Sequence, residues 1–263
     1  MKALKKYIKK RKSAINIILE TQQECFTADT FHKLRIEIKR LNALFHLINY
    51  SSKGFKRNKT FKPFKLIFKQ AGKVRELQIE ESMLKEYFMA NLLPEYGAFL
   101  RKNLIKKQEA FFSITNITSA KTLKKTFRKI SALHTKTNNK KANCYFNKIE
   151  TKIKKLLILS NLKAKQIHLL RKRLKEHHYN NESLDSTKKN KKNPKKDFLP
   201  ELLGEWHDYR VTISHLKKVI DSNEINSNEN NSLKKIKLIF KFKSESLFQK
   251  INKSIQISDF PST

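Results

Sequence analysis

Apolar residues recur every three or four positions along most of the chain, and strict two-residue alternation is not sustained. This spacing places apolar side chains on one side of an α-helix, whereas a half-buried strand needs alternation. The clearest apolar stripe, at about 100° per residue, consists of Phe31, Leu34, Ile38, Leu41, Phe45 and Ile48. Because the chain of 263 residues has only 4 glycines and 5 prolines, we predict an all-α fold of long helices.

Polar stretches rich in Lys and Asn interrupt the helical pattern and predict loops. These stretches are 51 to 62, 135 to 143, 180 to 197 and 221 to 232, and a polar tail follows Ile257. Within the third stretch, the run from Lys188 to Lys196 is predicted to be flexible. This run is a candidate for an additional electrostatic contact with a polyanion.

Two segments of the chain are repeated in the same order. FHKLRIEIKRL at 31 to 41 aligns with IHLLRKRLKEH at 167 to 177, and AGKVRELQI at 71 to 79 aligns with LGEWHDYRV at 203 to 211. Such self-similarity predicts a fold assembled from two copies of one helical unit. We therefore predict a single domain over 1 to 257, with halves at about 1 to 133 and 144 to 257, followed by a tail at 258 to 263.

Basic residues lie beside the apolar stripe in both copies. They are His32, Arg35, Lys39 and His46 in the first copy, with Arg40 further round the helix, and His168, Arg171, Lys172 and Lys175 in the second. The planar donor fork of Arg suits phosphate oxygens, and Lys adds a flexible point charge. A solvated helix face is the alternative, but such a face would accept Glu or Gln as readily at these positions. The recurrence of Arg and His therefore favours a phosphate-binding ridge on each helix.

One glycine of each copy lies inside a helical pattern, where it costs about 1 kcal/mol relative to alanine. These glycines are Gly72 and Gly204, and Glu76 and Asp208 follow them at equivalent places. We predict that close approach of another helix explains both glycines. We also predict that the two carboxylates orient basic side chains by ion pairing.

The charge of the chain points to an anionic partner. There are 59 Lys and Arg residues against 23 Asp and Glu residues, a formal charge of +36, and self-repulsion of this size is relieved by a polyanion. Many of the lysines also fit a general compositional bias. Two isolated cysteines, Cys25 and Cys144, fit a reducing compartment. The chain has no signal-peptide pattern and no run of roughly 20 apolar residues, so we expect a cytoplasmic protein without a membrane partner.

At the four repeated segments the sequence resembles the CHAD (conserved histidine α-helical domain) family. The family pattern is approximately His-x-x-Arg with further basic residues on one helix, and later a Gly-x-x-Arg-Asp-like segment, each occurring twice. The resemblance implies two four-helix bundles related by a pseudo-twofold axis, with the basic helices lining a central groove. It also implies binding of inorganic polyphosphate without catalysis, metal or cofactor, and targeting to polyphosphate granules is one role that such binding would serve. Carried over by position, the binding residues are His32, Arg35, Lys39, Arg40, Arg75, His168, Arg171, Lys172, Lys175 and His207.

The second copy departs from this pattern. Glu176 stands at the position of Arg40, and His207 stands at the position of Arg75. In the first copy, Glu76 replaces the expected Asp. These differences predict weaker binding by the second half. The N-terminal segment lacks the alternating Glu residues of the CYTH domain to which family members are sometimes fused, so we expect a stand-alone copy.

Two other function classes compete with polyphosphate binding. Nucleic acid would be attracted by the same charges, but base stacking needs aromatic residues on the basic face, and Phe31 and Phe45 lie on the apolar stripe. An enzyme is suggested by the His207-Asp208 dipeptide or by His32 or His168 as a phosphoryl acceptor. Neither basic helix supplies the clustered acids or HExxH spacing of a hydrolytic metal site.

Overall fold

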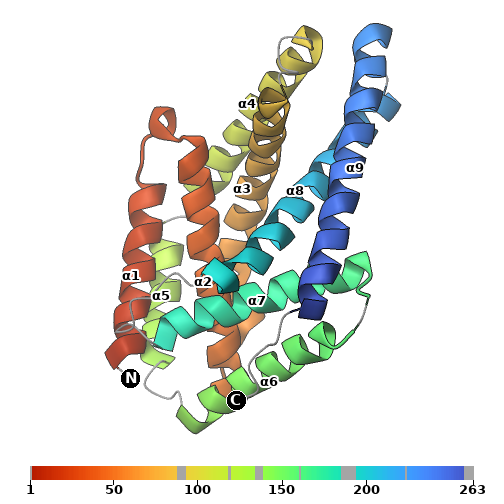
Figure 1. Ribbon diagram of the computed structural model, residues 1–263. Helices are drawn as coiled ribbons and strands as arrows, with labels where there is room; N and C mark the ends of the chain where they lie inside the picture. Colours follow the sequence, from red (N-terminus) through yellow and green to blue (C-terminus); the bar gives the residue numbers. More distant parts are fainter. Residues whose placement is uncertain are drawn as a thin grey trace. The chain divides into compact units, whose positions relative to one another are not determined.

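The computed structural model describes residues 2–87, 93–117, 120–133, 139–159, 161–184, 194–222 and 224–257. Within these ranges the regular elements are helices (Figure 1), which confirms the all-α prediction. In chain order they are α1 (Lys2–Leu19), the short 3-10 helix η1 (Gln23–Cys25), α2 (Ala28–Ser51), α3 (Arg57–Glu86), α4 (Pro94–Ile117), α5 (Ala120–Leu133), α6 (Asn139–Leu157), α7 (Ala164–Leu184), α8 (Pro194–Ser222) and α9 (Ser227–Ile257).

The helices form two compact units. Unit 1 comprises residues 1–73, 107–153 and 172–191, and unit 2 comprises 74–106, 154–171 and 192–263. Helices α3, α4, α6 and α7 therefore contribute residues to both units. Each unit draws on both of the halves predicted from the repeat, and the boundary between those halves stays a prediction.

Unit 1 is built around the apolar face of α2. All six residues of the predicted stripe are completely buried, and α1 packs against α2 and α5 (Figure 1). The ring of Phe31 lies 4.9 Å from that of Phe111, and the ring of Phe45 lies 6.2 Å from that of Phe64. The phenylalanines of α2 are thus core residues, as predicted, and Arg35 and Lys39 of the same helix are only partly exposed.

Local signals fix where α2 begins and ends. The hydroxyl of Thr27 accepts a hydrogen bond from the backbone N–H of Thr30 at 3.3 Å, which caps the first turn. At the other end, the N–H of Ser52 bonds the carbonyl of Ile48, and Gly54 takes a φ of 85° in the turn toward α3. A side chain is rarely tolerated at this φ, so glycine is needed there.

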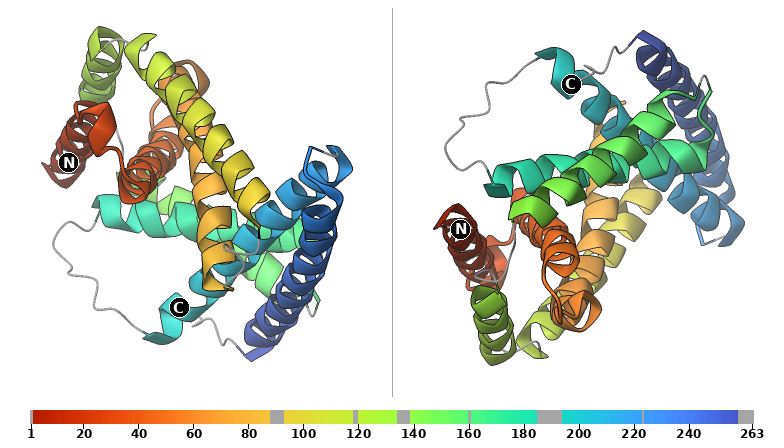
Figure 2. Two further views of the ribbon diagram at one scale, coloured as in Figure 1. Left: turned by 90° about the horizontal axis from the view of Figure 1, so that it is seen from above. Right: turned by 90° about the horizontal axis from the view of Figure 1, so that it is seen from below.

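Unit 2 contains the antiparallel pair α8 and α9, which lie side by side (Figures 1 and 2). The ring of Tyr209 lies 5.5 Å from that of Phe240. Glu229, in the first turn of α9, accepts hydrogen bonds from the backbone N–H groups of Glu95 and Tyr96 at 2.9 and 2.8 Å. A carboxylate from α9 therefore caps the start of α4, where it also matches the helix dipole.

Several helices extend into stretches predicted as loops. α7 continues to Leu184, α3 begins at Arg57, and α9 begins at Ser227. At the last of these, the side chain of Asn226 accepts a hydrogen bond from the N–H of Glu229 at 2.8 Å. Asn and Ser favour helix caps as well as loops, so the polar stretch marks a helix start. Residues 188–193 of the predicted flexible run lie outside the described residues.

Candidate functional site

Arg35, on α2, is held against α3 by a carbonyl group and an aromatic ring. Its Nη1 donates a hydrogen bond to the backbone oxygen of Phe68 at 3.0 Å. Its Cζ lies 4.4 Å from the centroid of the Phe68 ring, and the Nζ of Lys39 lies 6.0 Å from the same centroid. A cation within about 6 Å of an aromatic face is attracted to it. Phe68 therefore fixes the position of the Arg35 guanidinium.

Gly72 supplies the space that the Arg35 guanidinium occupies. A Cβ atom at position 72 would overlap Nη1 of Arg35 and would lie 3.3 Å from its Cζ. The close approach predicted at this glycine is confirmed, although the approaching group is the Arg35 side chain and not a helix backbone. We call Phe68 and Gly72 the Arg35 seat.

The corresponding prediction for Gly204 is wrong. Among the described residues, a Cβ atom at position 204 would meet no atom within 4 Å, so no described helix and no part of Arg171 approaches it closely. Aligning the two glycines places Pro200 at the position of Phe68. Proline has no aromatic face for a guanidinium, so the second copy lacks that part of the seat.

In unit 2 the structure instead brings together two predicted histidines. The rings of His168, on α7, and His207, on α8, have centroids 5.4 Å apart and planes inclined by 39°. Both side chains are partly exposed. Imidazole N–H groups from two helices are thus presented at one place, where they could donate hydrogen bonds to an anion.

The other predicted residues differ in exposure. His32 and Lys172 are exposed, whereas Arg75, Arg171 and Lys175 are half-buried. The Nε of Arg75 is buried and has no hydrogen-bond partner among the described residues. His32, Arg35, Lys39, Lys172 and Lys175 belong to unit 1, and Arg75, His168, Arg171 and His207 belong to unit 2. The central groove implied by the family resemblance stays a prediction.

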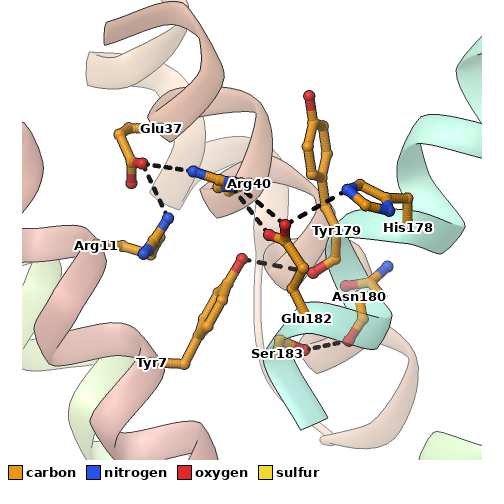
Figure 3. Close-up of polar contacts among 9 residues, drawn as sticks. All are labelled: Tyr7, Arg11, Glu37, Arg40, His178, Tyr179, Asn180, Glu182 and Ser183. Carbon is orange, nitrogen blue, oxygen red and sulfur yellow. Dashed lines mark hydrogen bonds and ion pairs between the residues drawn. The ribbon is translucent and has the colours of Figure 1, made fainter. Parts of the chain in front are cut away.

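Arg40 lies in an ion-pair network of unit 1 (Figure 3). Its Nε and Nη2 donate to the two carboxylate oxygens of Glu182 at 2.9 and 3.2 Å, and its Nη1 donates to Glu37 at 2.8 Å. Nη1 of Arg11 donates to the same Glu37 oxygen at 2.9 Å. Because two carboxylates bind its guanidinium, Arg40 holds α2 to α7.

The equivalent positions of the second copy form the same ion pair with the charges exchanged. Glu37 and Arg40 align with Arg173 and Glu176, and both pairs close at 2.8 Å. Glu176 also accepts a hydrogen bond from the hydroxyl of Tyr145 at 2.6 Å. The departure from the family pattern at Glu176 therefore preserves an ion pair that also exists in the first copy.

His46, which lies on the ridge side of α2, is partly buried beside this second ion pair. Its Nδ1 lies 3.8 Å from a carboxylate oxygen of Glu176. Burial lowers the pKa of His46 below its ordinary value, although the charge of Glu176 acts in the opposite direction. His46 therefore favours the neutral form, in which it adds no positive charge to the ridge.

A buried network in unit 2 was not anticipated from the sequence. Glu80 is 1% exposed; its carboxylate accepts a hydrogen bond from the hydroxyl of Tyr96 and lies 2.5 Å from Nδ1 of His215. Burial acts to lower the pKa of His215, but hydrogen bonding and the charge of Glu80 outweigh it, so the net pKa is raised. The three side chains join α3, α4 and α8 and have a structural role.

The described residues hold neither a metal-binding cluster nor a membrane-spanning helix. No three His, Cys, Asp or Glu side chains in this part of the chain come close enough to hold a metal ion. None of the helices within the described ranges is long and apolar enough to cross a membrane.

Comparisons with known proteins identify similar structures and no similar sequences. No family model matches the chain, and no curated protein matches it. The fold is similar to the crystal structure of the CHAD domain from the plant Ricinus communis, with a TM-score of 0.79 and 14% identity, over 99% of this chain and 93% of that one. It is also similar to PptA from Streptomyces chartreusis, with a TM-score of 0.70 and 12% identity, over 97% of this chain and 98% of that one. Both likenesses therefore extend over nearly the whole fold.

Proposed function

The chain has the CHAD fold, as its sequence predicted, and on this premise we propose that it binds inorganic polyphosphate without catalysis. The observation that carries the proposal is the Arg35 seat, which holds a guanidinium in place on the basic side of α2. The proposed ligands are His32, Arg35, Lys39, Arg75, His168, Arg171, Lys172, Lys175 and His207. Arg40 is left out because Glu37 and Glu182 bind its guanidinium.

The geometry of the Arg35 seat suits an anion built from repeated phosphates. The hydrogen bond to Phe68 fixes the plane of the Arg35 guanidinium. A side chain that is already ordered loses less conformational entropy when it binds. Lys39 follows Arg35 by one helical turn and His32 precedes it by nearly one, so successive phosphates could be met by successive cations along α2.

Nucleic acid remains the competitor to be tested. Its phosphates would be attracted by the same charge of +36. Stacking of bases needs exposed aromatic rings beside the cations. Phe31 and Phe45 of α2 are completely buried, and the partly exposed ring of Phe68 already has the Arg35 guanidinium against one face. The proposal therefore predicts that binding follows phosphate density and does not depend on base sequence.

The direct test is titration of the protein with long-chain polyphosphate at near-physiological salt, with duplex DNA and single-stranded RNA as competitors and free phosphate measured throughout. We expect tight binding that weakens steeply as salt is added, because bound cations displace counterions from the polymer. Displacement of polyphosphate by nucleic acid would favour the competitor. Steady release of phosphate would instead indicate an enzyme.

A matched pair of charge reversals separates the proposed ligands from the general charge of the protein. Arg35→Glu with Arg171→Glu should weaken polyphosphate binding by about 100-fold or more, since each charge-assisted hydrogen bond contributes roughly 1.5 to 3 kcal/mol. Arg101→Glu with Arg128→Glu changes the net charge equally at two exposed arginines of α4 and α5, and should have a much smaller effect. Equal losses in both variants, with helical content retained, would contradict the assignment of the ligands.

We place this binding in the cytoplasm, where association with polyphosphate granules would follow from it. A fluorescent fusion of the protein should co-localise with the granules, and the Arg35→Glu, Arg171→Glu variant should be dispersed. A variant that remains on the granules would show that another surface directs localisation.

A further inference from the structure

Helix α9 carries an apolar cluster on the side that faces away from the core of unit 2. Leu238 is 61% exposed, Ile239 is 40% exposed and Phe242 is 74% exposed. At about 100° per residue they lie within roughly 100° of one another, opposite the buried Leu233 and Phe240. Over the same two turns α9 is therefore apolar both toward the core and toward solvent. We call Leu238, Ile239 and Phe242 the α9 outer cluster.

Lysines surround the α9 outer cluster. The exposed lysines of these turns are Lys234, Lys235, Lys241 and Lys243, and the one acidic residue of the same turns is Glu245. An aromatic and two aliphatic side chains are thus exposed at the centre of a cationic rim. Large apolar side chains grouped on a surface commonly mark an interaction site.

The chemistry of this surface limits what could cover it. Polyphosphate has no apolar surface and would leave Phe242 in water. A second copy of the chain would bring the same lysines into contact, and like charges at an interface are unfavourable. A helical partner protein usually docks in a groove between elements, whereas these three side chains project from one face of a single helix.

We propose that the α9 outer cluster lies on an anionic lipid surface. Phe242 and Leu238 enter the boundary between headgroups and acyl chains, and the surrounding lysines meet lipid phosphates. Helices that lie in a membrane interface combine apolar residues on one face with Lys and Arg beside them, and basic residues near an anionic leaflet add to the attraction. The sequence predicted no membrane partner because the chain has no run of roughly 20 apolar residues to span a bilayer. A helix that lies on a bilayer needs no such run, so that prediction does not apply to this surface.

The proposal requires both the apolar and the cationic parts of the surface. Three partly exposed side chains bury too little area to hold the protein on neutral lipid, and lysines alone would bind any anionic surface without needing Phe242. Sedimentation with phosphatidylcholine vesicles that contain phosphatidylglycerol should therefore recover the protein, and vesicles of phosphatidylcholine alone should not. The absence of binding to the mixed vesicles would overturn the proposal.

Matched variants locate the contact. Leu238→Gln with Phe242→Gln should weaken binding to the mixed vesicles by about tenfold or more. The control, Ile105→Gln with Ile158→Gln, removes two apolar side chains of the same unit that are 56% and 80% exposed, and should leave binding unchanged. Equal losses in the two variants would overturn the assignment to α9.

A third variant separates this surface from the proposed polyphosphate ligands. Arg35→Glu with Arg171→Glu should keep most of the vesicle binding, because neither arginine belongs to α9. If this variant loses vesicle binding while Leu238→Gln with Phe242→Gln retains it, lipid phosphates bind at the polyphosphate ligands and the proposal is wrong. It is also wrong if the protein binds a Glu-rich amphipathic helical peptide through Phe242 and binds no vesicle.

Fluorescence gives a readout at the cluster itself. Trp206 is the single tryptophan of the chain and is buried, so Phe242→Trp in a Trp206→Phe background places the only indole on the outer face of α9. Circular dichroism checks that this variant keeps its helices. Its emission should shift to shorter wavelength when mixed vesicles are added. Unchanged emission in protein that sediments with the vesicles would show that another surface makes the contact.

Discussion

Gly72 and Gly204 stand at equivalent places in the repeated sequence, but the space beside them is used differently. The guanidinium of Arg35 fills the position where a Cβ atom of residue 72 would lie, whereas no atom lies within 4 Å of that position at residue 204. A glycine inside a helix costs about 1 kcal/mol, and in the first copy the placement of Arg35 accounts for that cost. A repeated glycine therefore does not identify a repeated site.

The ion pairs of the two copies show the opposite case, in which different residues form the same contact. Glu37 and Arg40 on α2 correspond to Arg173 and Glu176 on α7, and both pairs close at 2.8 Å although every charge is reversed. Either order of acid and base closes a salt bridge along a helix, although the order with the acid first is the more favourable one, so exchanging the two residues keeps the contact. The ion pair is thus repeated where the two copies have different residues. The close approach to the glycine is not repeated, although both copies have glycine there.

The largest expected effect tests the structural role of Arg40. Arg40→Gln should lower the free energy of unfolding by about 3 kcal/mol, because it removes the bidentate partner of Glu182 and one partner of the buried Glu37. Polyphosphate affinity of the folded variant should change little. Urea unfolding and polyphosphate titration of the same preparation measure the two quantities.

The matched control for Arg40→Gln is Arg173→Gln, in the second copy. Its cost should be smaller, because Glu176 keeps the hydrogen bond from Tyr145. If Arg40→Gln instead reduces polyphosphate affinity and leaves stability unchanged, Arg40 is a ligand and the distinction drawn between Arg35 and Arg40 fails.

The dependence of stability on acid pH should report the contribution of the Glu182 carboxylate, which pairs with Arg40. Burial alone would raise the pKa of Glu182, but hydrogen bonds from His178 and Arg40 and their charges outweigh it and lower the pKa from 4.5 to about 2. A lowered pKa stabilises the folded state at pH values above 4.5, and that stabilisation is lost as the pH falls from 4.5 toward 2. The lost stability amounts to roughly 2 to 3 kcal/mol after allowance for partial exposure of the side chain.

Glu182→Gln isolates this contribution. The difference in unfolding free energy between the original protein and the variant should be largest near neutral pH and should shrink between pH 4.5 and pH 2. A difference that stays constant over this range would mean that the Glu182 carboxylate is not held by Arg40 and His178 in solution.

The sequence predicted the fold and part of the candidate site because the relevant signals are local. Helical periodicity identified the buried stripe of α2, from Phe31 to Ile48. The repeat alignment and the family resemblance selected His168 and His207 separately, and their rings lie 5.4 Å apart. Phe68 was missed, but it precedes Gly72 by one helical turn and therefore lies on the same side of α3. An aromatic residue one turn before a helical glycine is a signal that could have found the seat.

The role of Arg40 could not be predicted from the sequence. Its partner Glu182 lies 142 positions away. Helical spacing places Arg40 further round α2 than Arg35, but it does not show that carboxylates bind Arg40. The open space beside Gly204 could not be predicted from the sequence either, because it depends on which side chains α8 contacts in the folded unit. Spacing along one helix predicts which face a residue occupies, and only packing shows what it contacts there.

A smaller effect is expected when the Arg35 seat is filled. Gly72→Ala should lower polyphosphate affinity by about fivefold, equivalent to roughly 1 kcal/mol, because the added methyl group displaces the guanidinium from Phe68. Stability should change little, since the displaced group is the flexible end of a side chain and alanine favours the helix. Titration beside urea unfolding distinguishes this result from general destabilisation, and an unchanged affinity would show that the seat is not needed for binding.

The smallest effect, at Gly204, decides whether the two copies differ in solution as they do in the structure. Gly204→Ala should raise the free energy of unfolding by roughly 0.5 to 1 kcal/mol, because the space is open and alanine is the better helix former. Polyphosphate affinity should not change, and the Gly72→Ala, Gly204→Ala double variant should bind as weakly as Gly72→Ala alone. If Gly204→Ala weakens binding as much as Gly72→Ala does, Arg171 also needs the space beside its glycine. The two copies would then hold their arginines in the same way, despite Pro200 in place of Phe68.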